Sequence, residues 1–487
     1  MIRDAVSAIQ VTRKLLDPIL AGSLLWCDGS NSAAVDPSFS QSAFCVSASH
    51  PDDSRPDSPL SNWKSINGMI GLFLITVGLS AALTLLARYA GNRAGLLDVP
   101  DEGRKQHAIA VPALGGIAVF AAFAIVFAAT YAFDLEFAST LSGSITALLA
   151  TASAVWMLGI VDDIWPVRAK TKLVVQIAAA IGYVVIARPI EALHFADGFE
   201  VTSEILIGIF CVFWLVACCN AVNLLDGMDG MAALQGMLGF ATLAAIAALH
   251  GDGTTATVCL LLVASVLGFA MFNAPPASIF LGDAGSMTIG YLLGALTLSA
   301  CHMADGRYGL AIPLAVMIIP AFDTTMAIVR RAQKGKGIMA PDREHFHHCL
   351  FDAGRSVWKV LGVFVVMYGL CAAAAIASVW TSSGLIASLA CGVVLVVCVG
   401  TRTFGHNELR VLGERLVSKV SRVGVVASLT SDIGSADAAT SELVIANAST
   451  DDREPAVIPI SAAISDDNTV SPEQSTDDED DEIRRAA

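Results

Sequence analysis

Charged residues are scarce in this chain of 487 residues: they make up 15% of it, whereas 55% of the residues are hydrophobic. A typical soluble domain carries about 25% charged residues, so the composition argues against a soluble multi-domain protein. The 11 cysteines include no CxxC pair, and most of them lie in apolar runs, where a thiol acts as a small apolar side chain. Neither a zinc site nor a disulfide framework is therefore predicted.

Both ends of the chain lack long apolar runs. Residues 1–62 have no compact signal-peptide core and are rich in Ser, Asp and Pro, so we interpret them as an N-terminal extension of unknown role. Residues 424–487 contain 15 acidic and 3 basic residues, a net charge of −12 out of −15 for the whole chain. Such an acidic segment without aromatic residues buries too little surface to fold and is predicted to be a disordered tail.

The rest of the chain consists largely of apolar runs, each close to the roughly 20 residues that span a bilayer. Their approximate limits are 66–88, 112–133, 141–161, 172–187, 203–219, 231–250, 255–273, 285–302, 309–330, 357–379 and 383–400. Continuous runs of this kind favour helices over the alternating strands of a barrel. We therefore expect an all-α integral membrane protein with 10 or 11 transmembrane helices in a domain at 63–402, followed by a juxtamembrane segment at 403–423.

Lysine and arginine are concentrated in alternate loops. They are abundant after the first, third and ninth runs, whereas the other loops hold only Arg188 and Arg307. Cytoplasmic loops of membrane proteins carry an excess of these residues. The chain is thus expected in the bacterial inner membrane, with the basic loops and the C-terminus in the cytoplasm and the N-terminus in the periplasm.

The loops expected on the cytoplasmic side hold most of the polar residues suited to catalysis, in five blocks at residues 101–107, 162–163, 220–230, 273–286 and 342–348. Carboxylates hold Mg²⁺, which in turn bridges to substrate phosphates. Basic side chains neutralise phosphate charge, and glycines let the backbone approach a ligand. Phosphoryl transfer needs these components, because positioning and charge stabilisation supply most of its catalysis.

Each block alone also has a structural explanation, as a solvated helix end, a capped turn or a helix stop. His347 and His348 are adjacent, a poor spacing for one tetrahedral zinc site. The occurrence of all five blocks on one membrane face favours a joint catalytic site on the cytoplasmic side.

These blocks, in this order, resemble the polyprenyl-phosphate N-acetylhexosamine-1-phosphate transferase family over about residues 90–350. The last one, Asp342-Arg343-Glu344-His345-Phe346-His347-His348, is similar to the His-aliphatic-His-His block of the undecaprenyl-phosphate N-acetylglucosaminyl-1-phosphate transferase branch, with phenylalanine at the aliphatic position. The resemblance implies an enzyme, dependent on Mg²⁺ or Mn²⁺, that transfers a sugar-1-phosphate from a UDP-N-acetylhexosamine to undecaprenyl phosphate. The default donor is UDP-GlcNAc. UMP is released, and a cell-envelope polysaccharide such as O-antigen is initiated.

The resemblance also implies roles for single residues. Asp283 is expected to be catalytic and, with Asp226, to bind the metal ion. Asp162 and Asp163 resemble the pair that engages the lipid phosphate, where one of them would deprotonate it. The residues expected to bind substrate are Lys105, His107, Asn223, Asp226, Asp229, Asn273, Arg343, His345, His347 and His348. The sequence is compatible with two mechanisms, a direct displacement and a two-step route through a phosphorylated Asp283.

Other functions stay open as well. A secondary transporter would place ionisable groups near the bilayer midplane, and Asp323 lies about 10 Å inside the ninth run at 1.5 Å per residue. A scaffold would tolerate replacement of the loop carboxylates. Within the family, another UDP-N-acetyl sugar is an alternative donor. The expected partners are the UDP-sugar, undecaprenyl phosphate and the bilayer. No nucleic-acid partner is expected. A homodimer is a further option.

Overall fold

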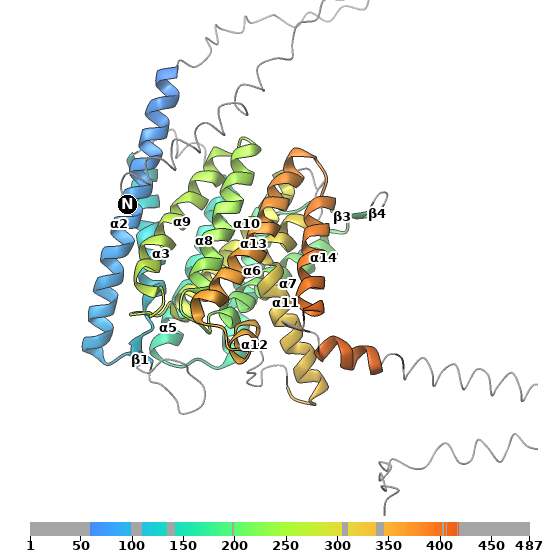
Figure 1. Cartoon of the computed structure of the whole chain (residues 1–487). Coiled ribbons are helices and arrows are strands. Elements are labelled where there is room, and N and C mark those ends of the chain that lie inside the picture. The colour runs from blue at the N-terminus through green and yellow to red at the C-terminus, as the bar shows by residue number, and fades with distance from the viewer. Residues whose placement is uncertain are drawn as a thin grey trace, which may run out of the picture. The chain divides into compact units, whose positions relative to one another are not determined.

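The computed structural model describes residues 59–98, 110–133, 142–196, 199–303, 310–337, 345–401, 404–405, 407–415 and 417. From Ser65 onward these residues belong to one compact unit, built from long helices (Figure 1). The helices that coincide with the expected apolar runs are α2 (Pro59–Ala94), α3 (Gly115–Phe133), α5 (Gly143–Ile164), α6 (Ala169–Ala187), α7 (Glu204–Leu225), α8 (Met231–Leu249), α9 (Gly253–Asn273), α10 (Gly282–Met303), α11 (Ala311–Gln333), α13 (Val357–Trp380) and α14 (Leu385–Gly400).

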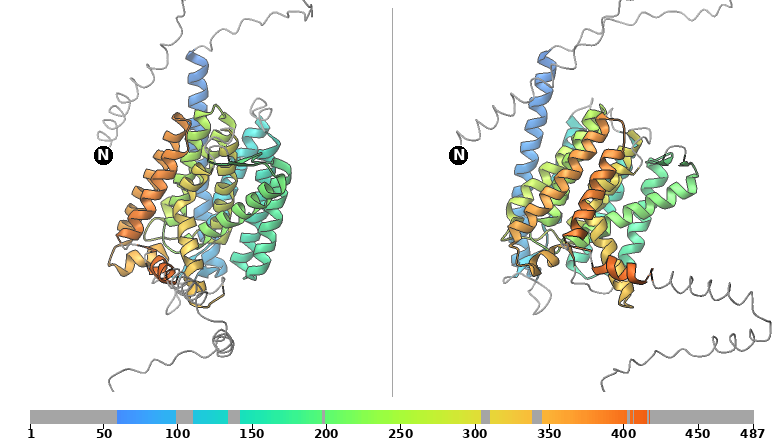
Figure 2. Two further views of the ribbon diagram at one scale, coloured as in Figure 1. Left: turned by 90° about the vertical axis from the view of Figure 1, so that its right-hand side faces the viewer. Right: turned by 45° about the vertical axis from the view of Figure 1, so that its right-hand side comes forward.

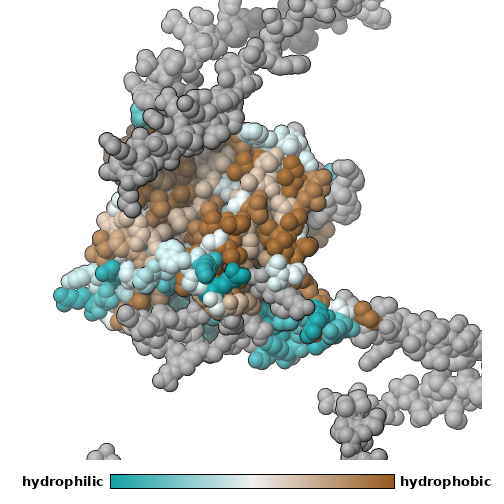
Figure 3. All heavy atoms as spheres, viewed as in Figure 1, coloured by the Kyte–Doolittle hydropathy of each residue, from teal (hydrophilic) through white to brown (hydrophobic). Residues whose placement is uncertain are grey.

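Among the described residues, nine helices are long and apolar enough to cross a membrane, and α10 and the 16-residue α14 are not among these nine. Large apolar side chains such as Leu74, Phe213 and Val366 are exposed on the outside of the bundle. Figure 3 shows the resulting apolar band, with polar residues gathered at one end. The prediction of an all-α integral membrane protein is confirmed, while the number of spans stays a prediction.

Helix α10 lies at the centre of the bundle. It packs against α3, α5, α7, α8 and α11, and nearly all of its described residues are buried. Small residues allow these close contacts, as they commonly do between membrane helices. A Cβ atom at Gly290 would lie 2.5 Å from the carbonyl oxygen of Cys218 in α7, and one at Gly159 of α5 would lie 2.3 Å from the Cα of Ala284.

The short elements lie in the loops. Strands β1 (Leu97–Asp98) and β2 (Val111–Pro112) pair antiparallel, as do β3 (Leu193–Ala196) and β4 (Phe199–Val201) around an irregular register. The short helix α12 (Phe346–Asp352) precedes α13. In the views of Figures 1 and 2, β1, the C-terminal end of α5 and α12 lie at the same end of the bundle. We call this end the polar face.

Backbone hydrogen bonds fix the N-terminus of α10 at the polar face. Phe280 N donates to Pro112 O at 2.8 Å, and Gly115 N donates to Phe280 O at 2.9 Å. Gly116 N donates to Leu281 O at 2.7 Å. The segment just before α10 is thereby tied to the start of α3, so the first turn of the central helix has a defined position.

Candidate active site

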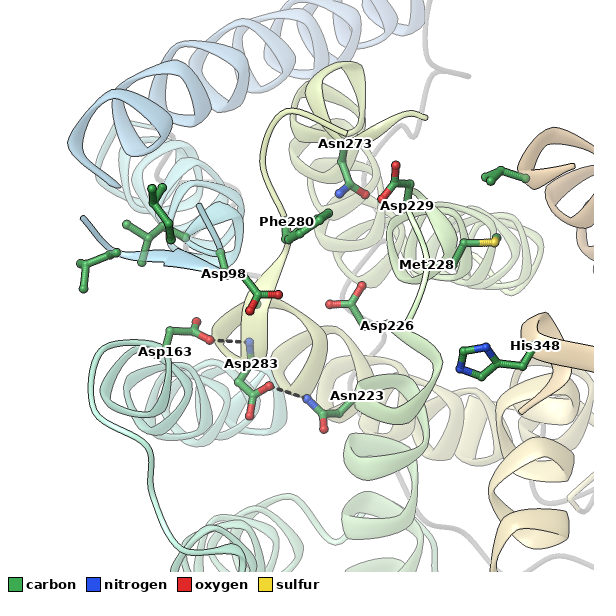
Figure 4. Close-up of a pocket in the computed structure, with 17 residues that line it drawn as sticks. Asp98, Asp163, Asn223, Asp226, Met228, Asp229, Asn273, Phe280, Asp283 and His348 are labelled. Atoms are coloured by element: carbon green, nitrogen blue, oxygen red, sulfur yellow. Dashed lines mark hydrogen bonds between the residues drawn. The ribbon is translucent and has the colours of Figure 1, made fainter. Parts of the chain in front are cut away.

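A cavity of about 610 Å³ opens at the polar face, next to the N-terminus of α10. Its wall is formed by β1, the segment before α3, the end of α5, the α7–α8 turn, the segment before α10, and α12. The carboxylates that line it belong to Asp98, Asp163, Asp226, Asp229 and Asp283 (Figure 4). No lysine or arginine from the described part of the chain lines this space, so the described lining is rich in carboxylates.

Asp163 fixes the backbone on which Asp283 is carried. Its two carboxylate oxygens accept hydrogen bonds from Asp283 N at 2.7 Å and from Ala284 N at 3.0 Å. Asp163 thus caps the N-terminus of α10 from another helix, where a negative charge also complements the helix dipole. Gly282 adopts a φ of +73°, and a Cβ there would lie 2.4 Å from Ala113 O. Glycine is therefore required at this close approach.

Both carboxylate oxygens of Asp283 are also engaged. The Nζ atom of Lys172 in α6 lies 2.5 Å from Oδ2, and Asn223 Nδ2 donates to Oδ1 at 2.9 Å. Asn223 donates to Ser286 Oγ as well, again at 2.9 Å. Asp283 therefore sits in a fixed orientation between a lysine and an amide.

Asp162 and Asp163 are adjacent in sequence, but their side chains contact different partners. Asp162 forms an ion pair with Lys172 and accepts a hydrogen bond from Val167 N at 2.7 Å. It does not line the cavity, whereas Asp163 does. Lys172 consequently bridges Asp162 and Asp283, which places Asp162 behind the cavity wall rather than in it.

The α7–α8 turn and the segment before α10 are joined by two side chains. Asp229 Oδ2 accepts from Ala277 N at 2.9 Å. Asn273 Oδ1 accepts from Gly230 N at 3.1 Å, and its Nδ2 donates to Ile279 O at 2.9 Å. Both side chains also line the cavity. They position the turn that carries Asp226.

Among the carboxylates of the cavity, Asp226 is the one whose negative charge is least compensated by neighbouring groups. It is half-buried, and none of the described residues donates a hydrogen bond to its side chain. Burial raises its pKa well above the ordinary value, and the nearby carboxylates, first Asp283 and then Asp163, raise it further. A cation in the cavity would compensate this charge.

The histidine block begins on a buried support. The Nδ1 atom of His345 lies 3.0 Å from Asp323 Oδ2, and Phe346 N donates to Asp323 Oδ1 at 2.9 Å. Asp323 is the acidic residue inside the ninth apolar run whose position was compatible with a transporter. In the structure, its two contacts hold the histidine block instead. His348 lines the cavity two residues after Phe346.

His347 is buried, and neither ring nitrogen has a hydrogen-bond partner among the described residues. Its ring lies 4.3 Å from that of His348, centroid to centroid. Burial, followed by the neighbouring His348, lowers the pKa of His347 to about 3. The imidazole is therefore neutral near pH 7.

The structure brings most of the residues expected from the sequence to one cavity. Those that line it are Asp163, Asn223, Asp226, Asp229, Asn273, Asp283 and His348, whereas Asp162, His345 and His347 lie behind the wall. Lys105, His107 and Arg343 fall outside the described residues.

Three residues have roles in the site that were not expected from the sequence. Asp98 lines the cavity from β1, Asp323 holds the histidine block, and Lys172 contacts Asp283. A helical pattern could have singled out Lys172. Gln176 and Tyr183, four and eleven residues later, are buried on the same side of α6. Arg168 and Lys170 are exposed.

Comparison with known proteins adds independent evidence. The family model described as "Glycosyl transferase family 4" matches residues 145–301, which include the Asp162-Asp163 pair and Asp283. The decaprenyl-phosphate N-acetylglucosaminephosphotransferase of Mycobacterium tuberculosis (H37Rv) is 31% identical over 356 residues, which cover 67% of this chain and 88% of the relative.

Two further relatives carry similar names. The protein named "Probable undecaprenyl-phosphate N-acetylglucosaminyl 1-phosphate transferase" of Bacillus subtilis is 31% identical over 318 residues, 64% of this chain and 86% of the relative. The undecaprenyl-phosphate alpha-N-acetylglucosaminyl 1-phosphate transferase of Escherichia coli K12 is 27% identical over 295 residues, 59% and 76% of the two chains. The resemblance drawn from the motifs is confirmed, and this chain belongs to glycosyl transferase family 4.

Proposed function

We propose that this protein transfers N-acetylglucosamine-1-phosphate from UDP-GlcNAc to undecaprenyl phosphate, with UMP as the second product, and so initiates a cell-envelope polysaccharide. The observation that carries the proposal is the single cavity in which residues from four of the five motif blocks surround the N-terminus of α10. Family membership and the names of the relatives agree with it. UDP-GlcNAc is the donor favoured by those names over other UDP-N-acetyl sugars.

The cavity has the location and the walls that two such substrates require. Its volume falls within the roughly 300–1,000 Å³ of typical ligand pockets. Its lining combines apolar side chains, including Leu97, Leu114 and Phe280, with polar ones, including Asp226 and His348. A lipid phosphate would enter from the bilayer, and the nucleotide sugar would enter from water. The excess of lysine and arginine in the loops at this end favours a cytoplasmic location for the polar face.

The carboxylate ligands in the cavity are suited to a divalent cation. No three His, Cys, Asp or Glu side chains among the described residues form a ready metal cage. Mg²⁺ does not need one, because it usually binds one or two carboxylates and completes its shell with water and substrate phosphates. Asp283 and the uncompensated Asp226 would hold it. A bound Mg²⁺ would neutralise the diphosphate of the donor.

The chemical step exchanges one phosphoanhydride for another. A phosphate oxygen of the lipid attacks the β-phosphorus of UDP-GlcNAc, the bond from that phosphorus to the bridging oxygen breaks, and the bridging oxygen leaves on UMP. Both oxygens of Asp283 are engaged, by Lys172 and Asn223, which makes this carboxylate a poor nucleophile. This arrangement favours direct displacement over a phosphorylated Asp283.

The function is tested with purified protein, undecaprenyl phosphate and a panel of UDP-N-acetyl sugars. UMP release and the mass of the lipid product are measured together. UDP-GlcNAc is expected to give the highest kcat/KM and an undecaprenyl-diphospho-sugar. Counterflow of a solute without a lipid product would instead identify a transporter.

Substitution of Gly227 by alanine is expected to impair transfer through His347. A Cβ at residue 227 would lie 2.7 Å from both Cε1 and Nε2 of the His347 ring, which is buried. Overpacking of this kind costs about 1–3 kcal/mol, equivalent to a rate loss of about 5- to 150-fold if it falls on the transition state. The measurement is kcat/KM for UDP-GlcNAc. Gly362→Ala, with open space around the new Cβ, is the matched control and should match wild type.

Deletion of residues 430–487 is expected to leave kcat within about twofold of wild type. The composition of this acidic stretch predicts that it does not fold, and its negative charge should repel anionic substrates. It should therefore not contribute to the site. The check is specific activity of the truncated protein after it elutes as a single species. A large loss would assign the tail a part in catalysis.

A further inference from the structure

We propose that the residues after α14 position the histidine block. The post-α14 segment, defined here as residues 404–405 and the short helix at 407–415, follows the last long helix and lies beside the end of α11 (Figure 2). It holds the end of α11 and the first residue of α12, and through them the histidines. The inference rests on the proposed function, in which this block faces the donor substrate.

A buried ion pair fastens the segment to α11. Glu408 and Arg330 form it, and their side chains are only 7% and 4% exposed. Gln333 Nε2 donates to Glu408 O at 2.9 Å, and Arg415 donates back to Gln333 O at 3.3 Å. Two charges taken out of water are tolerated only in a well-defined, hydrogen-bonded geometry. The C-terminal end of α11 is therefore fixed by residues far along the chain.

An aromatic contact extends this attachment to α12. Phe404 lies edge-on to Phe322 of α11, with ring centroids 5.5 Å apart, and edge-on to Phe346, the first residue of α12, at 6.0 Å. Edge-to-face pairs at such distances are favourable beyond their buried area. Gly405 has a φ of +78°, and a Cβ there would lie 2.8 Å from Phe322 Cζ. The chain turns back toward α11 at this glycine.

Phe346 is thus held from two sides. Its backbone N–H donates to Asp323 of α11, which also contacts His345, and its ring contacts Phe404. His348, two residues further on, lines the cavity. A shift of the post-α14 segment would move Phe346 and alter where the histidines lie.

The outer side of the same short helix provides a matched control. Arg410 and Glu414 form an ion pair at 3.8 Å, with side chains 72% and 68% exposed. Exposed pairs of this kind contribute little to stability. Loss of Glu414 should therefore leave the histidine block in place, whereas loss of Glu408 should not.

Hydrogen–deuterium exchange of the full-length protein tests the inference without relying on catalysis. In Glu408→Gln we expect the amides of residues 345–353 to exchange about tenfold faster, as for a locally opened element, while those of residues 282–290 keep the wild-type rate. Phe404→Leu should give the same pattern to a smaller extent, and Glu414→Gln should give none. Unchanged exchange at 345–353 in both test variants would overturn the proposal, and so would a uniform rise along the whole bundle.

Transfer assays supply the second readout. Glu408→Gln should lower kcat about tenfold, since small misplacements of positioned groups are costly, and leave the KM for undecaprenyl phosphate unchanged. Arg330→Met combined with Glu408→Leu removes both charges and should recover most of the loss. Wild-type protein that transfers no sugar phosphate would refute the proposed function, whereas the exchange pattern would still decide whether the segment holds α12.

Discussion

Asp283→Asn is expected to lower kcat by about 10³-fold, the upper range for loss of one preorganised electrostatic group. Asn223 and Lys172 fix this side chain at the N-terminus of the buried α10. Asparagine keeps the size of the side chain and removes its charge. The substitution therefore withdraws the group that would hold Mg²⁺ and leaves the packing of α10 intact. The measurement is UMP release at saturating substrates over a series of Mg²⁺ concentrations.

Asp252→Asn is the matched control for Asp283→Asn. Asp252 caps α9 by accepting from Thr255 N at 2.9 Å, away from the cavity lining, and asparagine caps helices as well as aspartate does. This variant should keep wild-type activity. Full turnover of Asp283→Asn, or of wild type in excess EDTA, would contradict the metal assignment.

Apolar runs predicted the long helices well because hydropathy and helix formation are coupled in a bilayer. The expected run at 357–379 became α13, Val357–Trp380. The run at 66–88 became α2, Pro59–Ala94, which continues into a polar stretch. Hydropathy marks the part of a helix that lipid can cover, not its end. The two short hairpins and α12 were not predicted, because tertiary hydrogen bonds in polar loops determine them.

The motifs predicted which segments meet but not the task of each residue. Successive helix residues point about 100° apart, so the adjacent carboxylates of α5 face different partners. Asp162 contacts Lys172, whereas Asp163 caps α10. Likewise Asn273, expected to bind substrate, lines the cavity while the oxygen and the nitrogen of its side-chain amide both hydrogen-bond to loop backbone. Such distinctions depend on neighbours that are remote in sequence.

Lys172→Met is expected to lower kcat by about 10²- to 10³-fold, the cost of losing one preorganised electrostatic contact in an active site. The lysine lies between the carboxylates of Asp162 and Asp283. Methionine has a similar length and no charge. Without the cation the two carboxylates repel each other, because like charges at short range in a low-dielectric site interact strongly. Asp283 should then leave the orientation set by Asn223.

The control is Lys170→Met, because Lys170 is exposed on the same helix and its loss should leave kcat unchanged. A double-mutant cycle then separates two roles of Lys172. If it positions Asp283, Asp162→Asn added to Lys172→Met removes the surplus charge and should recover part of the lost kcat. If Lys172 instead binds the lipid phosphate itself, the double variant should be no faster than Lys172→Met and should show a raised KM for undecaprenyl phosphate. The ion pairs on both sides of its ammonium group favour the first outcome.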